Sequence, residues 1–246
     1  MRYLGVVELE GWEPNLPLRL FQTHLPPRKE AIRAKGKFIY VARNPWDVAV
    51  SLFHMVTNLS LYRFEDGSFD ELLDAFLSDD VAGYGSYFDH VISGHAIKDE
   101  ANVLFVTYEN LLEDTKGTVM KLAHFLGEDY ARELQVDEEL CRKLLTRCKA
   151  DKMRETMIED LDKHSGPEFN GVAGNLKVTC KDGFRGDGNK YCFVREGKGG
   201  NWKEYFSAEQ LQRMEAAIRG AEEKSPVIDL WRNTRSEAFA ASGTQQ

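Results

Sequence analysis

Arg43 is the residue whose type and position best suit the binding of an anion. It follows a short apolar and partly β-branched run, residues 38–42, which is typical of a buried parallel strand. Asn44 is a good N-cap and Pro45 suits the first helical position, so a helix should begin directly behind the arginine. Free N–H groups, the positive end of the helix dipole and the guanidinium together predict a phosphate site. Ser51 can add a hydroxyl, because helical side chains lean toward the N-terminus; an ordinary strand–helix junction with a surface arginine is the alternative.

His24 is a second candidate site residue because of its position in the chain. It follows a short strand candidate, residues 19–23, and precedes Pro26 and Pro27, which stop the strand. A histidine at the end of a parallel strand lies at the carboxyl edge of the sheet, where open α/β proteins bind ligands. A loop histidine beside two prolines is the alternative.

Other segments supply the remaining elements of an α/β fold. Residues 102–107 predict a third parallel strand that ends at Tyr108, and residues 137–163 form a highly charged helix pattern. Residues 165–201 are rich in glycine, which predicts a long mobile loop. A final helix is expected over residues 206–218.

Composition limits the function classes. The chain has 246 residues, a mass of 28.0 kDa and 42% hydrophobic residues, which fits one α/β domain. Its net charge of −8 argues against a protein that coats nucleic acid or an anionic membrane. The four cysteines have neither CxxC spacing nor the density of a disulfide scaffold. No apolar run reaches membrane-spanning length and the N-terminus lacks the pattern of a signal peptide, so a cytoplasmic protein is expected.

Five separated segments resemble the cytosolic sulfotransferase family, in that family's order. They are FQTHLP, RNPWDVAVS, YGSYFDHV, VTYENL and REGKGGNW, and they span roughly residues 20–206. The resemblance implies an α/β fold of the P-loop type, with a three-layer arrangement in which helices flank a parallel sheet. It implies one sulfotransferase domain over residues 1–235, followed by a flexible tail over residues 236–246. A fragment of a P-loop nucleotide kinase is the alternative fold.

The resemblance also implies an activity and a role for each matching residue. The family transfers a sulfuryl group from PAPS (3′-phosphoadenosine 5′-phosphosulfate) to a hydroxyl or amine of a small-molecule acceptor, without a metal. His24 would be the general base and His90 would border the acceptor pocket. The nucleotide would be bound by the following residues: Arg43, Ser51, Tyr108, Arg195 and Gly197. A homodimer is a further expectation, although only Lys203 matches the family's short dimerisation motif outright.

The chain departs from the family pattern at several places. Glu196 puts an anion where a cation is expected, Gln22 replaces a lysine, and Cys148 lies in a region where an aromatic residue would stack on adenine. No segment resembles the family's phosphosulfate loop TYPKSGTTW, so the domain is expected to be truncated at its N-terminus. Since losing one charge stabiliser lowers a rate about 10²- to 10³-fold, little turnover is expected from this chain alone. The alternative is a catalytically deficient, truncated paralogue that binds PAP (the desulfated nucleotide) or pairs with an intact relative.

Overall fold

The structure is a computed structural model that describes residues 2–3, 21–30, 32, 36–78, 85–161, 179–180 and 189–243. In chain order the principal elements are β1 (Arg2–Tyr3), β2 (Phe21–Gln22), β3 (Phe38–Ala42), α1 (Pro45–Asn58), η2 (Ser60–Tyr62), α2 (Phe69–Leu77), α3 (Tyr87–Ala96), β4 (Val103–Thr107), α4 (Tyr108–Glu113), α5 (Thr115–Leu126), α6 (Glu128–Val136), α7 (Glu138–Arg147), α8 (Ala150–Thr156), β5 (Ile158–Asp160), β6 (Lys190–Cys192), η5 (Asn201–Glu204), α10 (Ala208–Glu222), η6 (Pro226–Trp231) and α11 (Arg232–Ala241).

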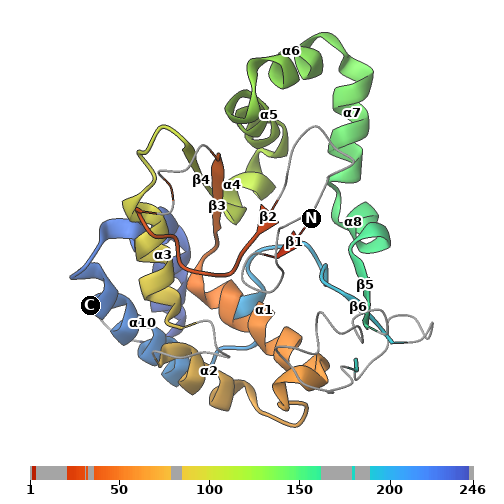
Figure 1. The fold of residues 1–246 in the computed structure, drawn as a ribbon. Coiled ribbons are helices and arrows are strands. Elements are labelled where there is room, and N and C mark those ends of the chain that lie inside the picture. Colours follow the sequence, from red (N-terminus) through yellow and green to blue (C-terminus); the bar gives the residue numbers. More distant parts are fainter. Residues whose placement is uncertain are drawn as a thin grey trace.

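A parallel strand pair, β3 and β4, carries the site (Figure 1). The register runs from Phe38 opposite Val103 to Ala42 opposite Thr107, so both strands end at the same edge. In the described residues β2 pairs with β1 in a separate parallel ribbon, and β5 pairs antiparallel with β6. The α/β class predicted from the sequence is confirmed, whereas the antiparallel ribbon was not anticipated.

The turn from β3 into α1 forms as its residue types predict. The side chain of Asn44 caps the helix by accepting a hydrogen bond from the main-chain N–H of Asp47, and Pro45 occupies the first turn. Val48, Leu52 and other apolar side chains of α1 then pack against the core. Only two residues, Arg43 and Asn44, therefore separate the end of β3 from the start of α1.

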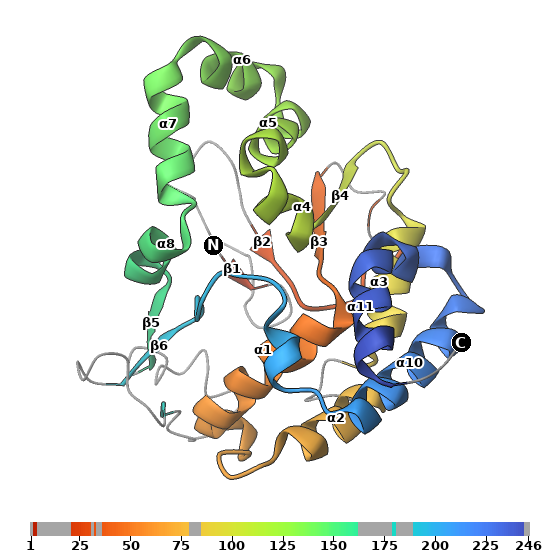
Figure 2. The same cartoon turned by 180° about the vertical axis from the view of Figure 1, so that it is seen from behind.

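One face of the β3–β4 pair packs against the main core. Tyr40 and Phe105 stack on this face with ring centroids 5.4 Å apart, and α1, α3 and α10 contribute buried side chains to the same cluster. Figures 1 and 2 show α5 to α8 as an arch on the opposite side of the molecule from α2 and α10. The alternating side chains Ile39 and Val41 of β3 are exposed, at 38% and 58% of their surface.

Several element boundaries differ from those expected. The charged segment 137–163 divides into α7, α8 and β5, and the helix expected over residues 206–218 is α10, which begins after the capping box of Ser207. Residues 190–192, expected in a loop, form β6. Arg19, Leu20, Gly83, Tyr84 and most of the glycine-rich segment lie outside the described residues.

The C-terminal helix α11 crosses the boundary at residue 235 that was predicted for the end of the domain. It continues to Ala241, and Ala238 is buried in the main core. Regular structure therefore extends into the segment predicted to be a tail. No helix among the described residues is long and apolar enough to cross a membrane.

Candidate functional site

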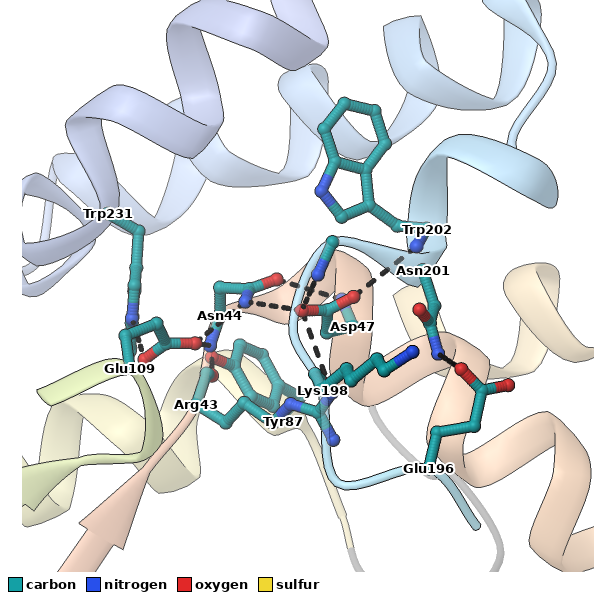
Figure 3. A network of polar contacts seen from close by, with 11 residues as sticks. Arg43, Asn44, Asp47, Tyr87, Glu109, Glu196, Lys198, Asn201, Trp202 and Trp231 are labelled. Carbon is teal, nitrogen blue, oxygen red and sulfur yellow. Dashed lines mark hydrogen bonds and ion pairs between the residues drawn. The ribbon is translucent and has the colours of Figure 1, made fainter. Parts of the chain in front are cut away.

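Arg43 lies at the end of β3 with its guanidinium over the ring of Tyr108, 4.5 Å from Cζ to the ring centroid. Its Nη2 donates a hydrogen bond to the main-chain oxygen of Lys198 at 3.1 Å (Figure 3). Its Nε is buried and has no hydrogen-bond partner among the described residues. The hydroxyl of Tyr87 donates to the main-chain oxygen of Arg43 at 2.6 Å, which fixes the backbone of this junction. The guanidinium is thus held by its surroundings while one donor stays unpaired within that part of the chain.

The N-terminal N–H groups of α1 are mostly occupied by protein groups, contrary to the expectation that they are free for a phosphate. The N–H of Asn44 donates to Glu109 Oε1 at 3.0 Å, the N–H of Asp47 donates to Asn44 Oδ1 at 2.8 Å, and Pro45 has no N–H. Two carboxylates, those of Asp47 and Glu109, already lie at the positive end of the helix. An anion near this end must therefore rely mainly on Arg43.

Glu109 connects the junction to the C-terminal part of the chain. Besides the N–H of Asn44, its Oε1 accepts a hydrogen bond from Asn44 Nδ2 at 2.7 Å, and its Oε2 accepts one from the indole N–H of Trp231 at 2.7 Å (Figure 3). Trp231 is 3% exposed. Glu109 thereby joins α4, η6 and the cap of α1.

Asp47 joins the junction to a segment 153 residues further along the chain. Its Oδ2 accepts a hydrogen bond from the N–H of Gly200 at 2.8 Å, and its Oδ1 accepts one from the N–H of Trp202 at 3.3 Å. The carboxylate is 1% exposed, and its charge faces Arg43 Nη2 at 3.6 Å. Because a buried carboxylate is costly unless it is paired, these contacts fix the 198–202 segment against α1.

Arg195 is oriented by its own neighbours. Its Nη1 pairs with the carboxylate of Glu196, whose other oxygen accepts a hydrogen bond from Asn201 Nδ2 at 3.1 Å. The main-chain oxygen of Arg195 accepts a hydrogen bond from Arg154 Nη1 at 3.0 Å. Glu196 therefore engages the arginine that was predicted to bind a phosphate.

Gly197 and Ser51 complete the residues predicted to bind the nucleotide. Gly197 has a φ of +67°, a left-handed conformation that favours glycine, and a Cβ at this position would lie 2.4 Å from the Cβ of Ala150. Ser51 is exposed on α1. The fold thus requires glycine at position 197, and this requirement alone is enough to account for the residue.

His24 and His90 form a second cluster. The ring Nε2 of His90 lies 3.2 Å from the main-chain oxygen of His24, and its Nδ1 lies 2.7 Å from the hydroxyl of Tyr40. The pKa of His24 is lowered from 6.5, mainly by desolvation of the His24 ring and further by the nearby His90. The side chain of His24 nevertheless remains partly exposed. His24 is therefore neutral near pH 7, the state that a general base requires.

The structure brings the predicted residues together in two groups. Arg43 contacts Tyr108 and the 198–202 segment, while His24 contacts His90. Nothing in the sequence indicated the roles of Asp47, Glu109, Trp231 and Tyr40, because each depends on a partner distant in sequence. Among the described residues, no group of three or more His, Cys, Asp or Glu side chains is arranged to hold a metal ion.

The fold and the site define an α/β protein with a cation held where two parallel strands end. A comparison with protein families matches residues 12–229 to the sulfotransferase domain. This chain belongs to the sulfotransferase domain family.

Individual relatives and solved structures agree with this assignment. The chain is 28% identical over 216 residues to the amine sulfotransferase of Oryctolagus cuniculus and 32% identical over 216 residues to sulfotransferase 1B1 of Canis lupus familiaris, and these matches cover 87% and 86% of this chain. Retinol dehydratase in complex with androsterone and the inactive cofactor PAP is similar in structure, with a TM-score of 0.61, 25% identity and coverage of 87% of this chain and 56% of that chain. Mouse sulfotransferase SULT7A1 complexed with PAP shares the fold with a TM-score of 0.63, 24% identity and coverage of 90% and 73%.

The chain spans only part of the length of these relatives. The matches cover 64% of each of the first two sulfotransferases and 49% of human sulfotransferase 2B1.

Proposed function

We propose that the chain transfers a sulfuryl group from PAPS to a hydroxyl or amine of a small-molecule acceptor. The observation that carries this proposal is the junction at Arg43, where two segments of the family pattern meet although 155 residues separate the contacting residues. Asp47 reinforces that meeting point through Gly200 and Trp202. Family membership and the PAP in the two similar structures support the nucleotide as the shared ligand.

The nucleotide would be held by side chains on both sides of this junction. Arg43 supplies a guanidinium whose buried Nε has no partner in the described part of the chain, and the ring of Tyr108 lies against that guanidinium. Ser51 adds a hydroxyl from α1, and Arg195 adds a second cation once it is released from Glu196. Gly197 allows the main chain between these groups to turn.

His24 would act as the general base and His90 would border the acceptor. The acceptor atom attacks the sulfur of the phosphosulfate, the bond from sulfur to the bridging oxygen breaks, and PAP leaves with the electrons of that bond. The acceptor's proton moves to the ring of His24, whose lowered pKa keeps it neutral before the reaction. As in phosphoryl transfer, the protein contributes mainly position and charge.

We also propose the cellular location of this activity and the type of acceptor. A cytoplasmic location is supported by the resemblance to cytosolic sulfotransferases and by the four cysteines at positions 141, 148, 180 and 192, whose spacing is not that of a disulfide scaffold. The androsterone in one similar structure, that of retinol dehydratase, supports an apolar small molecule as acceptor.

The test combines a binding measurement with a transfer measurement on the full chain. Titration calorimetry with PAP should detect binding, and Arg43→Ala should weaken it about 10- to 150-fold, since a charged hydrogen bond contributes about 1.5–3 kcal/mol. Transfer of ³⁵S from labelled PAPS should be measured with a phenol, a steroid alcohol and an aryl amine. His24→Ala should abolish transfer and leave the affinity for PAP unchanged.

Arg132→Ala is the matched control, because Arg132 is an exposed arginine of α6 that pairs with Asp129 at 3.0 Å, on the arch of helices. It should change neither PAP binding nor transfer. Failure of the unmodified chain to bind PAP would refute the proposal, as would transfer that continues at the same rate in His24→Ala.

A further inference from the structure

Tyr40, His90 and His24 form a continuous chain of hydrogen bonds from the sheet to the loop of the proposed base. Tyr40 belongs to β3 and His90 to α3, while His24 follows β2 outside any regular element. The hydroxyl of Tyr40 lies 2.7 Å from His90 Nδ1 and 3.0 Å from the main-chain oxygen of His90. His90 Nε2 lies 3.2 Å from the main-chain oxygen of His24. Both ring nitrogens of His90 are therefore engaged.

The acceptor groups in this series of hydrogen bonds determine which atoms carry the protons. A main-chain oxygen only accepts, so His90 Nε2 must carry a proton. A neutral imidazole carries one proton, so His90 Nδ1 is then an acceptor, and the single proton of the Tyr40 hydroxyl is shared between this nitrogen and the main-chain oxygen of His90. Burial lowers the pKa of His90 and raises that of Tyr40, which favours a neutral imidazole and a protonated phenol.

The position of Tyr40 is itself fixed by packing. Its ring stacks on Phe105 with an interplanar angle of 10° and a centroid distance of 5.4 Å. At Gly94, one turn beyond His90 on α3, a Cβ would lie 2.3 Å from Cζ of the Tyr40 ring. Glycine at this position allows α3 to approach β3 closely enough for the hydroxyl to reach His90.

We propose that Tyr40 and His90 are positioning residues that hold the main chain of His24 through an Nε2-protonated imidazole. This inference rests on the proposed function, in which His24 is the general base. His24 lies outside any helix or strand, and the hydrogen bond from His90 links its main chain to α3. Since a displacement of about 1 Å at a reacting group can cost about 10²-fold in rate, loss of this link would slow catalysis by displacing His24.

The first test is nuclear magnetic resonance of the histidine rings in the ¹⁵N-labelled full chain. In the unmodified protein near pH 7.5, the ¹⁵N shifts and ring couplings of His90 should report the Nε2–H tautomer. Tyr40→Phe should move His90 toward a mixture of tautomers and should also shift the resonances of His24. Tyr205→Phe is the matched control, because Tyr205 makes a similar contact of 2.7 Å to His54 Nε2; it should alter His54 and leave His24 and His90 unchanged.

The second test separates positioning from binding. Tyr40→Phe and His90→Met should lower kcat about 10- to 100-fold while the affinity for PAP stays unchanged. His90→Gln should recover kcat relative to His90→Met, because its amide nitrogen can still donate to the main-chain oxygen of His24. If His90 had only a structural role, His90→Gln would be as impaired as His90→Met.

The outcomes of the two tests are distinguishable from failure of the proposed function. If the unmodified chain transfers no sulfuryl group, the proposed function fails, but the ring tautomers still decide the positioning role. A His90 ring protonated on Nδ1, or His24 resonances that do not respond to Tyr40→Phe, would overturn the inference even in an active enzyme.

Discussion

Replacing Glu196 by glutamine should strengthen the binding of PAP about 5- to 30-fold. The carboxylate of Glu196 pairs with Arg195 Nη1 and accepts a hydrogen bond from Asn201 Nδ2 at 3.1 Å. Glutamine has nearly the same shape, and its side-chain oxygen can still accept from Asn201. The substitution therefore removes a charge and leaves the packing unchanged.

Two effects contribute to the expected gain. The side chains of Arg195 and Glu196 are 37% and 41% exposed, so their ion pair is screened and contributes only about 0.2–1 kcal/mol. A phosphate of charge about −1.5 to −2, placed roughly 8 Å from the carboxylate in water, is repelled by about 0.8–1 kcal/mol. Together they amount to about 1–2 kcal/mol, which is about a 5- to 30-fold change in the dissociation constant.

Titration calorimetry with PAP at low and high salt measures this effect. The gain should shrink at high salt, because mobile ions screen charges that are exposed to solvent. Glu139→Gln is the matched control: Glu139 of α7 also pairs with nearby cations, Arg142 and Lys143, and its loss changes the net charge equally. PAP binding that is unchanged or weaker in Glu196→Gln, in a chain that binds PAP before the substitution, would refute the reasoning.

Three further predictions concern the same region. Asp47→Asn should lower the free energy of unfolding by about 1–3 kcal/mol, because an amide cannot accept both main-chain hydrogen bonds with two oxygens; an unchanged midpoint in urea would contradict this. Gly197→Ala should lower the free energy of unfolding by about 1–3 kcal/mol, since its φ of +67° is strained for alanine and its Cβ would meet Ala150 at 2.4 Å. In the same denaturation assay it should cost more than Gly200→Ala, because Gly200 also has a positive φ, +85°, but its Cβ would meet nothing within 4 Å. The acidic midpoint of transfer activity should lie below pH 6.5, because desolvation lowers the pKa of His24 and a base is active when neutral; a pH–rate profile whose acidic midpoint lies above pH 6.5 would contradict this.

The sequence predicted the local parts of this site well. Residues 38–42 form the expected strand, Asn44 caps the expected helix, and Arg43 lies between them. These features depend on residue types within a few positions of one another: β-branched residues for the strand, and a side-chain acceptor followed by proline for the helix start. The order of the family-like segments likewise led to the correct family before any contact was known.

The parts that could not be predicted depend on contacts between distant segments. The N–H of Asn44 is taken by Glu109, 65 residues away, so the helix end offers fewer free donors than its sequence suggests. Arg195 was expected to face a phosphate, and the structure pairs it with Glu196. No local pattern shows which carboxylate will reach which donor; the only available signal was Glu196 itself, an acidic residue where the family has a basic one.

The indole of Trp231 connects the C-terminal part of the chain to the ligand site. It donates to Glu109, which in turn accepts hydrogen bonds from the cap of α1, so the C-terminal part helps to hold the site in place. A proteolytic cut or a shortened transcript that removed η6 would leave a partly buried carboxylate oxygen of Glu109 without its donor. The damage would then appear at the backbone of Arg43, far along the polypeptide from the lesion. Variants near the C-terminus that impair the protein therefore need not act through global unfolding.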